Sequence, residues 1–416
     1  MRILILTFEN PFPPRGGFNN AVYMTAKLLA EDNEVYVISW GKGIDAKSDI
    51  GSLHFIHHGK AQLNDLSSSS FTWRQRVGTM NQLGSTLGIP QLLCTISKGI
   101  SYSDVINKIP FPVDLIINEL PSSCNLAKVL SSRHGIPLIE RFHWVGLPWY
   151  LPTIDEWLRF SGVHENGVLK YMRLLRPSLN EALIKFQVNL TTSSNLITVT
   201  TKDKELLLAH GLRHDISVIH SAQPDYSTTS EQQGFPELHN PYFVFFSTNS
   251  VSNSIALNYL NRVSGLFPNI GFFVTGIPVS EGLTQRFRKL RFMGYLDNKL
   301  FASLLSNTDG ILFPMVEGHG LQTKLITALS IGKPVVATSA ITQSIPVLEN
   351  EKHLLIRDTP DLFTQAIRDI LESSDTSSKL SYESRIIFDE EFSINSHKKR
   401  MKQYIDSVLN LNSEHF

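Results

Sequence analysis

The chain has 416 residues and a formal net charge of +0, with 42% hydrophobic and 18% charged residues. A chain of this length is longer than one that usually folds around a single hydrophobic core, so two domains are predicted. The balanced charge gives no overall reason to bind nucleic acid. Two cysteines exclude a disulfide framework and favour a reducing compartment, and no apolar run is long enough to span a membrane.

Predicted strands and helices alternate through the first half of the chain. Residues 2–7 form an apolar run that is too short for a signal peptide and that we interpret as a strand buried on both faces. A loop rich in Pro and Gly, which contains Gly16 and Gly17, leads into a helix over 19–29 and a strand over 34–40. This order is typical of the start of a doubly wound sheet.

The rest of the first half repeats this alternation with less regular stretches between. Residues 61–110 suggest mostly helices and long loops, and residues 165–188 predict a long helix. Further strands are predicted over 53–58, 113–120, 136–143 and 196–200.

A second series of strands and helices follows residues 226–240, which carry no apolar periodicity. Its predicted strands cover 242–248, 270–276, 310–315, 334–339 and 353–358. Its clearest helices cover 254–267, 298–308 and 361–374.

We therefore expect an α/β protein with two Rossmann-like, doubly wound domains that face each other across a cleft. The first domain is predicted over residues 1–225, the linker over 226–240 and the second domain over 241–390. Residues 391–416 predict an amphipathic C-terminal helix that crosses back to the first domain.

The stretch EGHG at residues 317–320 is the strongest candidate for a ligand site. Gly318 and Gly320 permit backbone angles that other residues avoid, and a helix that begins near Leu321 offers free N–H groups to a diphosphate. Lys324 in its first turn adds a positive charge, whereas Glu317 suits sugar hydroxyls. A strand-to-helix turn with a solvated Glu explains the same spacing equally well.

Longer stretches around this motif resemble the GT-B glycosyltransferases of family 4, also described as glycosyl transferases group 1. They are FMGYLDNKLFASLLSNTDGILFPM followed by EGHGLQTKLITALSIGKPVVATS, with LITVTTKDKELLLAHGLRHDISVIHSA, FENPFPPRGGFNNAVYMTAKLLAEDNEVYVIS and SRIIFDEEFSINSHKKRMKQYIDSVL elsewhere. The resemblance spans nearly the whole chain and is weakest over 60–110 and 145–190. It implies a retaining transferase that uses a UDP- or GDP-linked sugar, with no further cofactor and no metal.

The resemblance also implies roles for single residues. Glu317 matches an acid that contacts the donor sugar and is catalytic, and His143 matches a catalytic histidine at the end of a strand. The glycines Gly16, Gly17, Gly318 and Gly320 match positions whose backbone faces the donor. His319, Leu321, Lys324 and Thr327 complete the implied donor site.

Two features depart from the family pattern. The second acid, which usually holds the nucleotide ribose, falls at Leu325 or, in the better register, at Thr327, so no carboxylate is present. Residues 249–259 also lack the basic pair that many members place after the first strand of this domain. Lys324 is the predicted substitute for that charge.

Other polar and aromatic side chains have two interpretations each. Glu119 and the neighbours Glu140 and Arg141 end strands and could line the acceptor side, although an ion pair between the latter two is favoured. The basic runs 73–76 and 397–403 could touch anionic lipid, and a solvated face is favoured. The aromatic residues Trp144, Trp149 and Tyr150 could stack on a sugar or pack in loops.

Together these observations predict a retaining, hexosyltransferase-like enzyme (EC 2.4) that moves a sugar from a nucleoside diphosphate to a saccharide or lipid-linked acceptor. We expect it in polysaccharide or glycoconjugate synthesis, in the cytoplasm or in peripheral contact with the inner membrane face. The alternatives are a non-catalytic GT-B partner subunit and another nucleotide-sugar enzyme such as a 2-epimerase. A dehydrogenase is disfavoured because no G-x-G-x-x-G follows the first strand.

Overall fold

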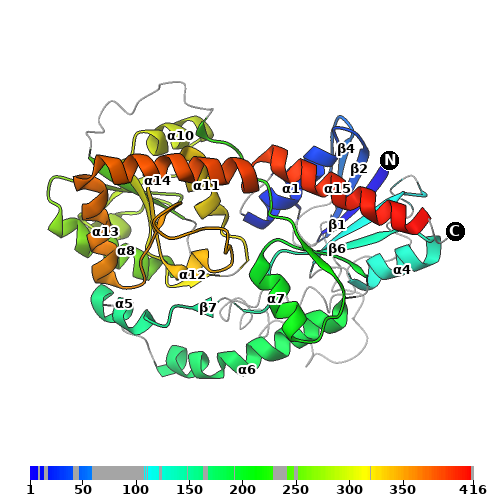
Figure 1. Ribbon diagram of the computed structural model, residues 1–416, viewed down its shortest axis with the longest axis horizontal. Coiled ribbons are helices and arrows are strands. Elements are labelled where there is room, and N and C mark those ends of the chain that lie inside the picture. The colour runs from blue at the N-terminus through cyan, green and yellow to red at the C-terminus, as the bar shows by residue number, and fades with distance from the viewer. Residues whose placement is uncertain are drawn as a thin grey trace. The chain divides into compact units, whose positions relative to one another are not determined.

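The computed structural model forms two compact units of α/β structure (Figure 1). Unit 1 comprises Met1–Leu147, Arg176–Ala222 and His397–Phe416, and unit 2 comprises Pro148–Leu175 and Gln223–Ser396. The structure describes residues 1–7, 10–13, 17–40, 46–58, 107, 109, 111–120, 124–147, 149–162, 167–191, 193–227, 241–247, 252–318 and 320–413.

Unit 1 is built on an eight-stranded sheet in the order β3-β4-β2-β1-β5-β6-β8-β9. The pairs are parallel except at one edge, where β3 runs antiparallel to β4. The strands are β1 (Arg2–Thr7), β2 (Glu34–Trp40), β3 (Ala46–Ile50), β4 (Leu53–His58), β5 (Leu115–Leu120), β6 (Leu138–Phe142), β8 (Asn195–Thr198) and β9 (Ile216–Val218).

Alternation along β1 explains why this sheet is buried on both faces. Ile3 and Ile5 point into one core, to which the C-terminal helix adds Met401 and Ile405, whereas Leu4 points into the core on the opposite face. The helices of unit 1 are α1 (Gly17–Leu29), α4 (Cys124–His134), α6 (Gly167–Leu190), α7 (Thr201–Ala209) and α15 (Ile394–Ser413), of which α6 and α15 extend beyond the unit.

Unit 2 contains a six-stranded parallel sheet in the order β12-β11-β10-β13-β15-β16. Its strands are β10 (Tyr242–Phe246), β11 (Gly271–Thr275), β12 (Arg291–Gly294), β13 (Gly310–Phe313), β15 (Val335–Ala337) and β16 (Leu355–Ile356). A separate antiparallel pair joins β7 (Trp149–Tyr150) to β14 (Glu317–Gly318).

The helices of unit 2 pack around this sheet with a large core of aromatic and aliphatic side chains. They are α5 (Ile154–Ser161), α8 (Ser252–Val263), α9 (Glu281–Arg286), α10 (Asn298–Ser306), α11 (Thr323–Ile331), α12 (Ser339–Thr342), α13 (Pro360–Glu372) and α14 (Ser374–Ile387). A 3₁₀ turn at Ser264–Leu266 and a π-helical turn at Phe388–Phe392 complete the set.

The expected doubly wound α/β architecture is confirmed, with differences in detail. The edge strand β3 and the helix α5 were not predicted, and residues 148–175, expected in the first domain, lie in unit 2. The prediction for 61–106 lies outside the described residues.

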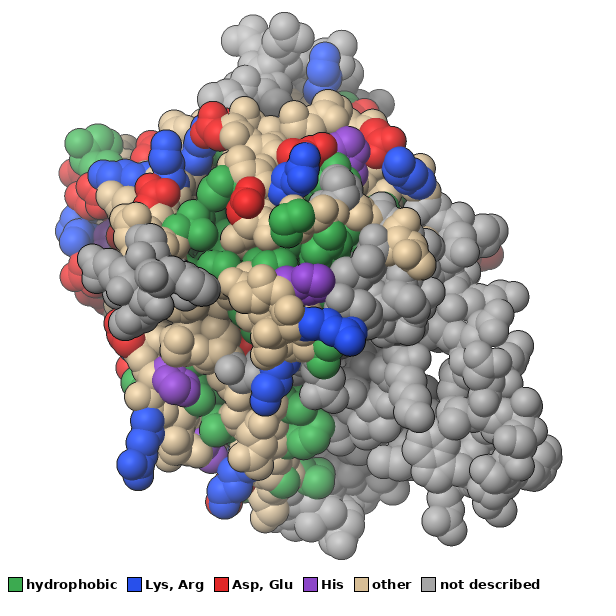
Figure 2. All heavy atoms as spheres, turned by 90° about the vertical axis from the view of Figure 1, so that its right-hand side faces the viewer, with side chains coloured by type: hydrophobic (Ala, Val, Ile, Leu, Met, Phe, Trp, Pro, Cys, Tyr) green, Lys and Arg blue, Asp and Glu red, His purple; other side chains and the backbone are tan. Residues whose placement is uncertain are grey.

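The surface agrees with the balanced composition. On the face shown in Figure 2, acidic and basic side chains of the described residues are interspersed around a central group of hydrophobic side chains. Of the described helices, none is long and apolar enough to cross a lipid bilayer.

Trp157 is the side chain that ties α5 into unit 2. It is fully buried, its ring centroid lies 4.8 Å from that of Tyr259 and 5.7 Å from that of Phe363, and its Nε1 donates to the Asp358 carbonyl at 2.8 Å. The excursion of the chain through residues 149–162 is therefore part of the unit 2 core.

We predict that Trp157→Ala lowers the free energy of unfolding of unit 2 by about 3–5 kcal/mol, because it leaves a large cavity and removes one of the two side-chain hydrogen bonds to the Asp358 carbonyl. Denaturant unfolding measures the loss. The exposed neighbour Glu156 supplies the control, since Glu156→Ala should change stability by less than about 0.5 kcal/mol. Equal effects of the two substitutions would contradict the assignment of α5 to the core.

Candidate functional site

The strand order of unit 2 identifies where a ligand is expected. The chain leaves the central strand β10 toward β11 on one side and returns to β10 through β13 on the other. In open parallel sheets, ligands bind beyond the carboxyl ends of the strands at such a switch point. Ser247 directly follows β10, and Glu317 follows β13, so both lie at this edge.

Lys324 connects the two loops at the switch point. It lies in the first turn of α11, and its Nζ donates to Ser247 Oγ at 3.3 Å. Burial lowers the pKa of the Lys324 ammonium to about 8, and the carboxylate of Glu317 opposes this shift. The site thus holds a partly desolvated cation close to a carboxylate.

The first turn of α11 is open to a ligand in one further respect. Gln322 precedes the helix, and its side chain makes no capping hydrogen bond to the first-turn amides. Amides at a helix N-terminus carry partial positive charge and suit an anion. The helix begins at Thr323, two residues after the predicted start at Leu321, whose side chain packs against the unit 2 core.

Gly318 and Gly320 suit their positions in the motif for different structural reasons. Gly320 has a φ of 55°, and its carbonyl accepts a hydrogen bond from Ser344 Oγ at 3.1 Å. Gly318 does not have a positive φ, contrary to the expectation for both glycines. A Cβ on Gly318 would lie 2.1 Å from the Ala340 carbonyl oxygen, so close backbone approach requires glycine there.

An antiparallel pair fixes the backbone beside Glu317. Glu317 lies opposite Tyr150 and Gly318 lies opposite Trp149, and the Leu151 amide donates to the Val316 carbonyl at 2.9 Å. The carboxylate at 317 therefore projects from a backbone that is paired with β7 rather than from a free loop.

The candidates for the second acid position differ in burial. Leu325 is fully buried in the core, which leaves it unable to meet a ligand. Thr327 lies three residues after Lys324 and so on the same helix face, with 8% exposure. His319 lies outside the described residues.

In unit 1, buried polar residues gather at the carboxyl ends of the central strands. Glu119 near the end of β5 is fully buried, and its Oε2 lies 2.6 Å from Nε2 of His143, which follows β6. Arg141 is also fully buried, with Nη1 3.4 Å from Glu119 Oε1. The expected position of His143 beside the carboxyl edge agrees with this structure.

The predicted ion pair between Glu140 and Arg141 is wrong about the partner of the arginine. Adjacent residues of a strand point to opposite faces, so the two side chains diverge. Arg141 pairs with Glu119 on β5, while Glu140 accepts a hydrogen bond from the Ser193 amide at 2.9 Å.

The loop after His143 is held by side chains from two helices. The amides of residues 145–147 donate in turn to Asp203 Oδ1 at 2.8 Å, Gln187 Oε1 at 2.8 Å and Asn180 Oδ1 at 2.5 Å. Burial raises the pKa of the Asp203 carboxyl to about 7, against hydrogen bonds that lower it. Three consecutive anchored amides give the histidine a rigid support.

Aromatic side chains pack beside the His143 ring. Phe18, the second residue of α1, packs edge-on against the His143 ring with centroids 4.6 Å apart and lies 5.7 Å from Trp144. Gly17 begins this helix, so its position is at the same edge of the sheet. Gly16 lies outside the described residues, as do the side chains of Trp149 and Tyr150.

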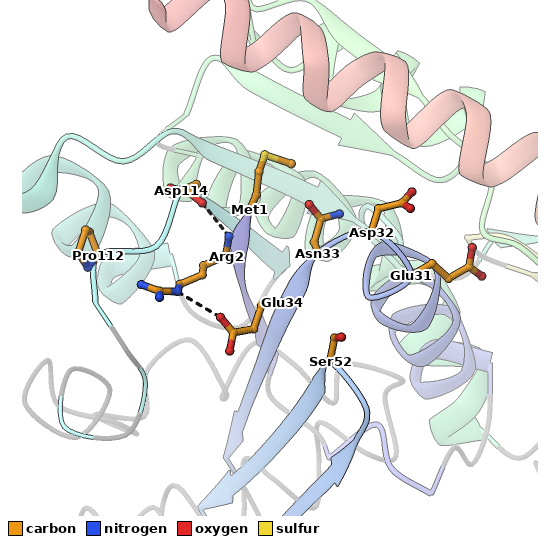
Figure 3. Close-up of a pocket in the computed structure, with 9 residues that line it drawn as sticks. All are labelled: Met1, Arg2, Glu31, Asp32, Asn33, Glu34, Ser52, Pro112 and Asp114. Atoms are coloured by element: carbon orange, nitrogen blue, oxygen red, sulfur yellow. Dashed lines mark hydrogen bonds and ion pairs between the residues drawn. The ribbon is translucent and has the colours of Figure 1, made fainter.

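A hollow of about 640 Å³ lies at the opposite, amino-terminal ends of the unit 1 strands (Figure 3). Its central side chain is Arg2, whose Nε donates to Glu34 at 3.1 Å and whose backbone N donates to Asp114 at 2.7 Å. Because these charged groups are paired with one another, the hollow is not the candidate site. Within the described ranges, no three His, Cys, Asp or Glu side chains are arranged to hold a metal ion.

Ser247 and the partnership of Glu119 with His143 were missed from the sequence. Ser247 is an ordinary residue after a strand, and only its contact with Lys324 reveals it. For Glu119 and His143 the sequence offered a signal, because Glu119 lies near the end of β5, His143 directly follows β6, and these two strands are parallel neighbours.

We predict that Gly318→Ala disrupts the switch-point loop, because the new Cβ would collide with the Ala340 carbonyl. Such a change should cost about 1–3 kcal/mol of stability. Gly282→Ala is the matched control: it lies in α9, meets no atom within 4 Å and should stabilise the protein by about 0.5–1 kcal/mol. Thermal unfolding of both variants tests this, and a stable Gly318→Ala variant would contradict it.

Comparison with known proteins supports the fold over the whole chain. Sucrose-phosphate synthase from Thermosynechococcus elongatus aligns with a TM-score of 0.66 and 14% identity, covering 99% of both chains. HepE from Anabaena in complex with UDP aligns with a TM-score of 0.60 and 14% identity, covering 98% of this chain and 100% of that one. A glycosyltransferase from Rickettsia africae aligns with a TM-score of 0.59 and 12% identity, covering 98% of each.

Sequence comparison gives a match in unit 2 alone. Residues 257–373 match the family described as glycosyl transferases group 1, a range that includes β11 to β16 and the Glu317–Thr327 motif. No curated protein sequence matches the chain significantly. The chain therefore shares the GT-B fold of solved glycosyltransferases over its full length, and a segment of unit 2 is similar to the group 1 glycosyl transferases.

Proposed function

We propose that the protein transfers a sugar, with retention, from a nucleoside diphosphate sugar to an acceptor hydroxyl. The observation that carries the proposal is the contact between Lys324 and Ser247 beside Glu317 at the switch point of unit 2. This part of unit 2 combines a desolvated cation, helix amides without a side-chain cap and a carboxylate. These are groups that bind a diphosphate and a sugar.

On this proposal the diphosphate binds at the start of α11. The first-turn amides and the Lys324 ammonium stabilise the negative charge that grows on the leaving diphosphate as the sugar–phosphate bond breaks. Because Lys324 is partly desolvated, its charge acts more strongly there than it would in water.

Glu317 is the proposed partner of the donor sugar. Its carboxylate accepts hydrogen bonds from hydroxyl groups, and the paired backbone of β14 holds it in place. Unit 1 is the proposed acceptor side, where His143 accepts a hydrogen bond from a sugar hydroxyl. Retention, membership of family 4 and a role in polysaccharide or glycoconjugate synthesis follow the sequence resemblance, as does work in the cytoplasm or at the inner membrane face.

A uridine nucleotide is the first donor to examine. Solved structures of HepE contain UDP, UDP and glucose, or UDP-glucose, and a trehalose-6-phosphate protein from E. coli is bound with UDP-2-fluoro glucose. These ligands belong to those proteins, and they support testing UDP and UDP-glucose before other nucleotides.

A non-catalytic partner subunit is the second candidate function. It is favoured by Thr327, which stands on the Lys324 face of α11 where the resemblance expects a carboxylate. A single hydroxyl holds a ribose less firmly than a carboxylate does. This candidate predicts that the protein binds no nucleotide.

We predict that one nucleoside diphosphate raises the unfolding temperature of the full chain. Ligand at about 100 times its dissociation constant stabilises the folded state by about 2.7 kcal/mol. The measurement is thermal unfolding with the diphosphates UDP, GDP, ADP or dTDP, and with the monophosphate CMP. No shift with any of them would reject the donor site and favour the partner subunit.

We predict that nucleotide affinity falls as the pH rises through about 8, because Lys324 then loses its proton and its charge. Lys324→Gln should bind weakly at every pH, and Lys324→Arg should bind with little pH dependence. Calorimetric titration with UDP measures these affinities. Lys333→Gln, just beyond the far end of α11, is the control that should behave as the wild type.

We predict that Glu317→Gln retains the fold and nucleotide binding but loses most sugar transfer, because the amide keeps the shape and loses the negative charge. Release of UDP from UDP-glucose measures turnover, and the thermal shift with UDP measures binding. Undiminished turnover would remove Glu317 from the proposed site.

A further inference from the structure

The fully buried carboxylate of Glu119 has no role in the function proposed above. A buried charge is costly unless it is paired and hydrogen-bonded, so its surroundings need an explanation. Oε1 faces Arg141 Nη1 at 3.4 Å, and Oε2 faces His143 Nε2 at 2.6 Å. The carboxylate therefore bridges a permanent cation and an imidazole.

Arg141 holds Glu119 in its ionised form. Burial favours the protonated carboxyl, but the charges and hydrogen bonds of Arg141 and His143 outweigh it and keep the pKa of Glu119 below its usual range. The guanidinium also donates to two neutral hydroxyls among the described residues, Thr25 Oγ1 at 2.8 Å and Ser221 Oγ at 2.9 Å. They position Arg141 without competing for its charge.

A further titratable group near Arg141 is His397, which is neutral. Burial lowers the pKa of His397 on α15 to about 3. Its Nδ1 lies 2.7 Å from the His220 carbonyl oxygen, and its Nε2 lies 3.1 Å from Thr25 Oγ1. Thus Arg141 is fixed from α1 and from the C-terminal helix while Glu119 keeps its charge.

An ionised Glu119 determines which nitrogen of His143 carries the proton. A carboxylate accepts hydrogen bonds and cannot donate, so the 2.6 Å contact requires a hydrogen on Nε2. Burial lowers the pKa of His143, although Glu119 opposes this, so the ring is neutral and Nδ1 bears a lone pair. No described residue hydrogen-bonds Nδ1, and the side chain keeps 5% exposure.

We propose that Glu119 is a positioning residue that fixes His143 as the Nε2–H tautomer and so presents the Nδ1 lone pair to a sugar hydroxyl. The function assigned to this lone pair rests on the proposed transferase activity, whereas the tautomer itself does not. Without the carboxylate, both tautomers are allowed, and the Nδ1–H form offers the hydroxyl a donor where it needs an acceptor.

The test is nitrogen NMR of the full chain labelled with ¹⁵N-histidine. His143→Gln identifies the His143 signals by their loss among the 14 histidines. In the wild type we expect a pyrrole-like Nε2 and a pyridine-like Nδ1 at neutral pH. In Glu119→Gln we expect an averaged or reversed pattern, because an amide can accept from or donate to Nε2.

Activity adds a second readout. Glu119→Gln should lower turnover of UDP-glucose by about tenfold or more, since catalytic contacts of a correctly placed imidazole contribute at least that much. Its thermal shift with UDP should persist, because the diphosphate site lies in unit 2. Glu140→Gln is the matched control: it changes a buried carboxylate on the other face of β6 and should leave the His143 tautomer unchanged.

A wild-type His143 that is Nδ1–H or doubly protonated overturns the proposal, and this holds even if Glu119→Gln does not fold. So does an unchanged tautomer in folded Glu119→Gln. The predicted tautomers together with no nucleotide binding would support the positioning role of Glu119 and reject only the transferase function.

Discussion

Both candidate regions depend on the parallel direction of strands in the two sheets. A parallel strand cannot return by a tight turn, so each connection crosses over and the loops at the carboxyl ends gather along one edge. In unit 2 this brings Ser247 after β10 together with Lys324, which follows β13 by eleven residues. In unit 1 it brings Glu119 and His143 from adjacent strands to 2.6 Å.

The polar groups at these edges are partly or wholly removed from water, and this changes their pKa values. Desolvation lowers the pKa of Lys324 and of His143 and raises that of Asp203. The same loss of solvent makes each unpaired charge costly, which explains why Arg141 and Glu119 are surrounded by hydrogen-bond partners. The same desolvation therefore accounts both for the shifted pKa values and for the dense hydrogen bonding at these edges.

The positions of the buried strands could be predicted from the sequence, because buried parallel strands appear as continuous apolar runs, as in residues 2–7 and 242–246. Strand β3 was missed because the polar stretch AKSDI at a sheet edge lacks such a pattern. The pairing of Trp149–Tyr150 with Glu317–Gly318 joins residues 167 and 169 positions apart in the chain, beyond any local signal. Arg141 was given the wrong partner because sequence neighbours were preferred over strand neighbours.

Neither unit is made from a continuous piece of chain, and this has a consequence for biosynthesis. Unit 2 needs α5 and Trp157, which are synthesised long before β10, whereas unit 1 lacks Met401 and Ile405 until α15 has been synthesised. During synthesis, the apolar residues of β1 and α1 that α15 covers in the folded protein therefore remain partly exposed until α15 has left the ribosome. Each core is therefore completed only after segments that are distant in the sequence have all been synthesised, so neither unit can finish folding when only its first segment has emerged.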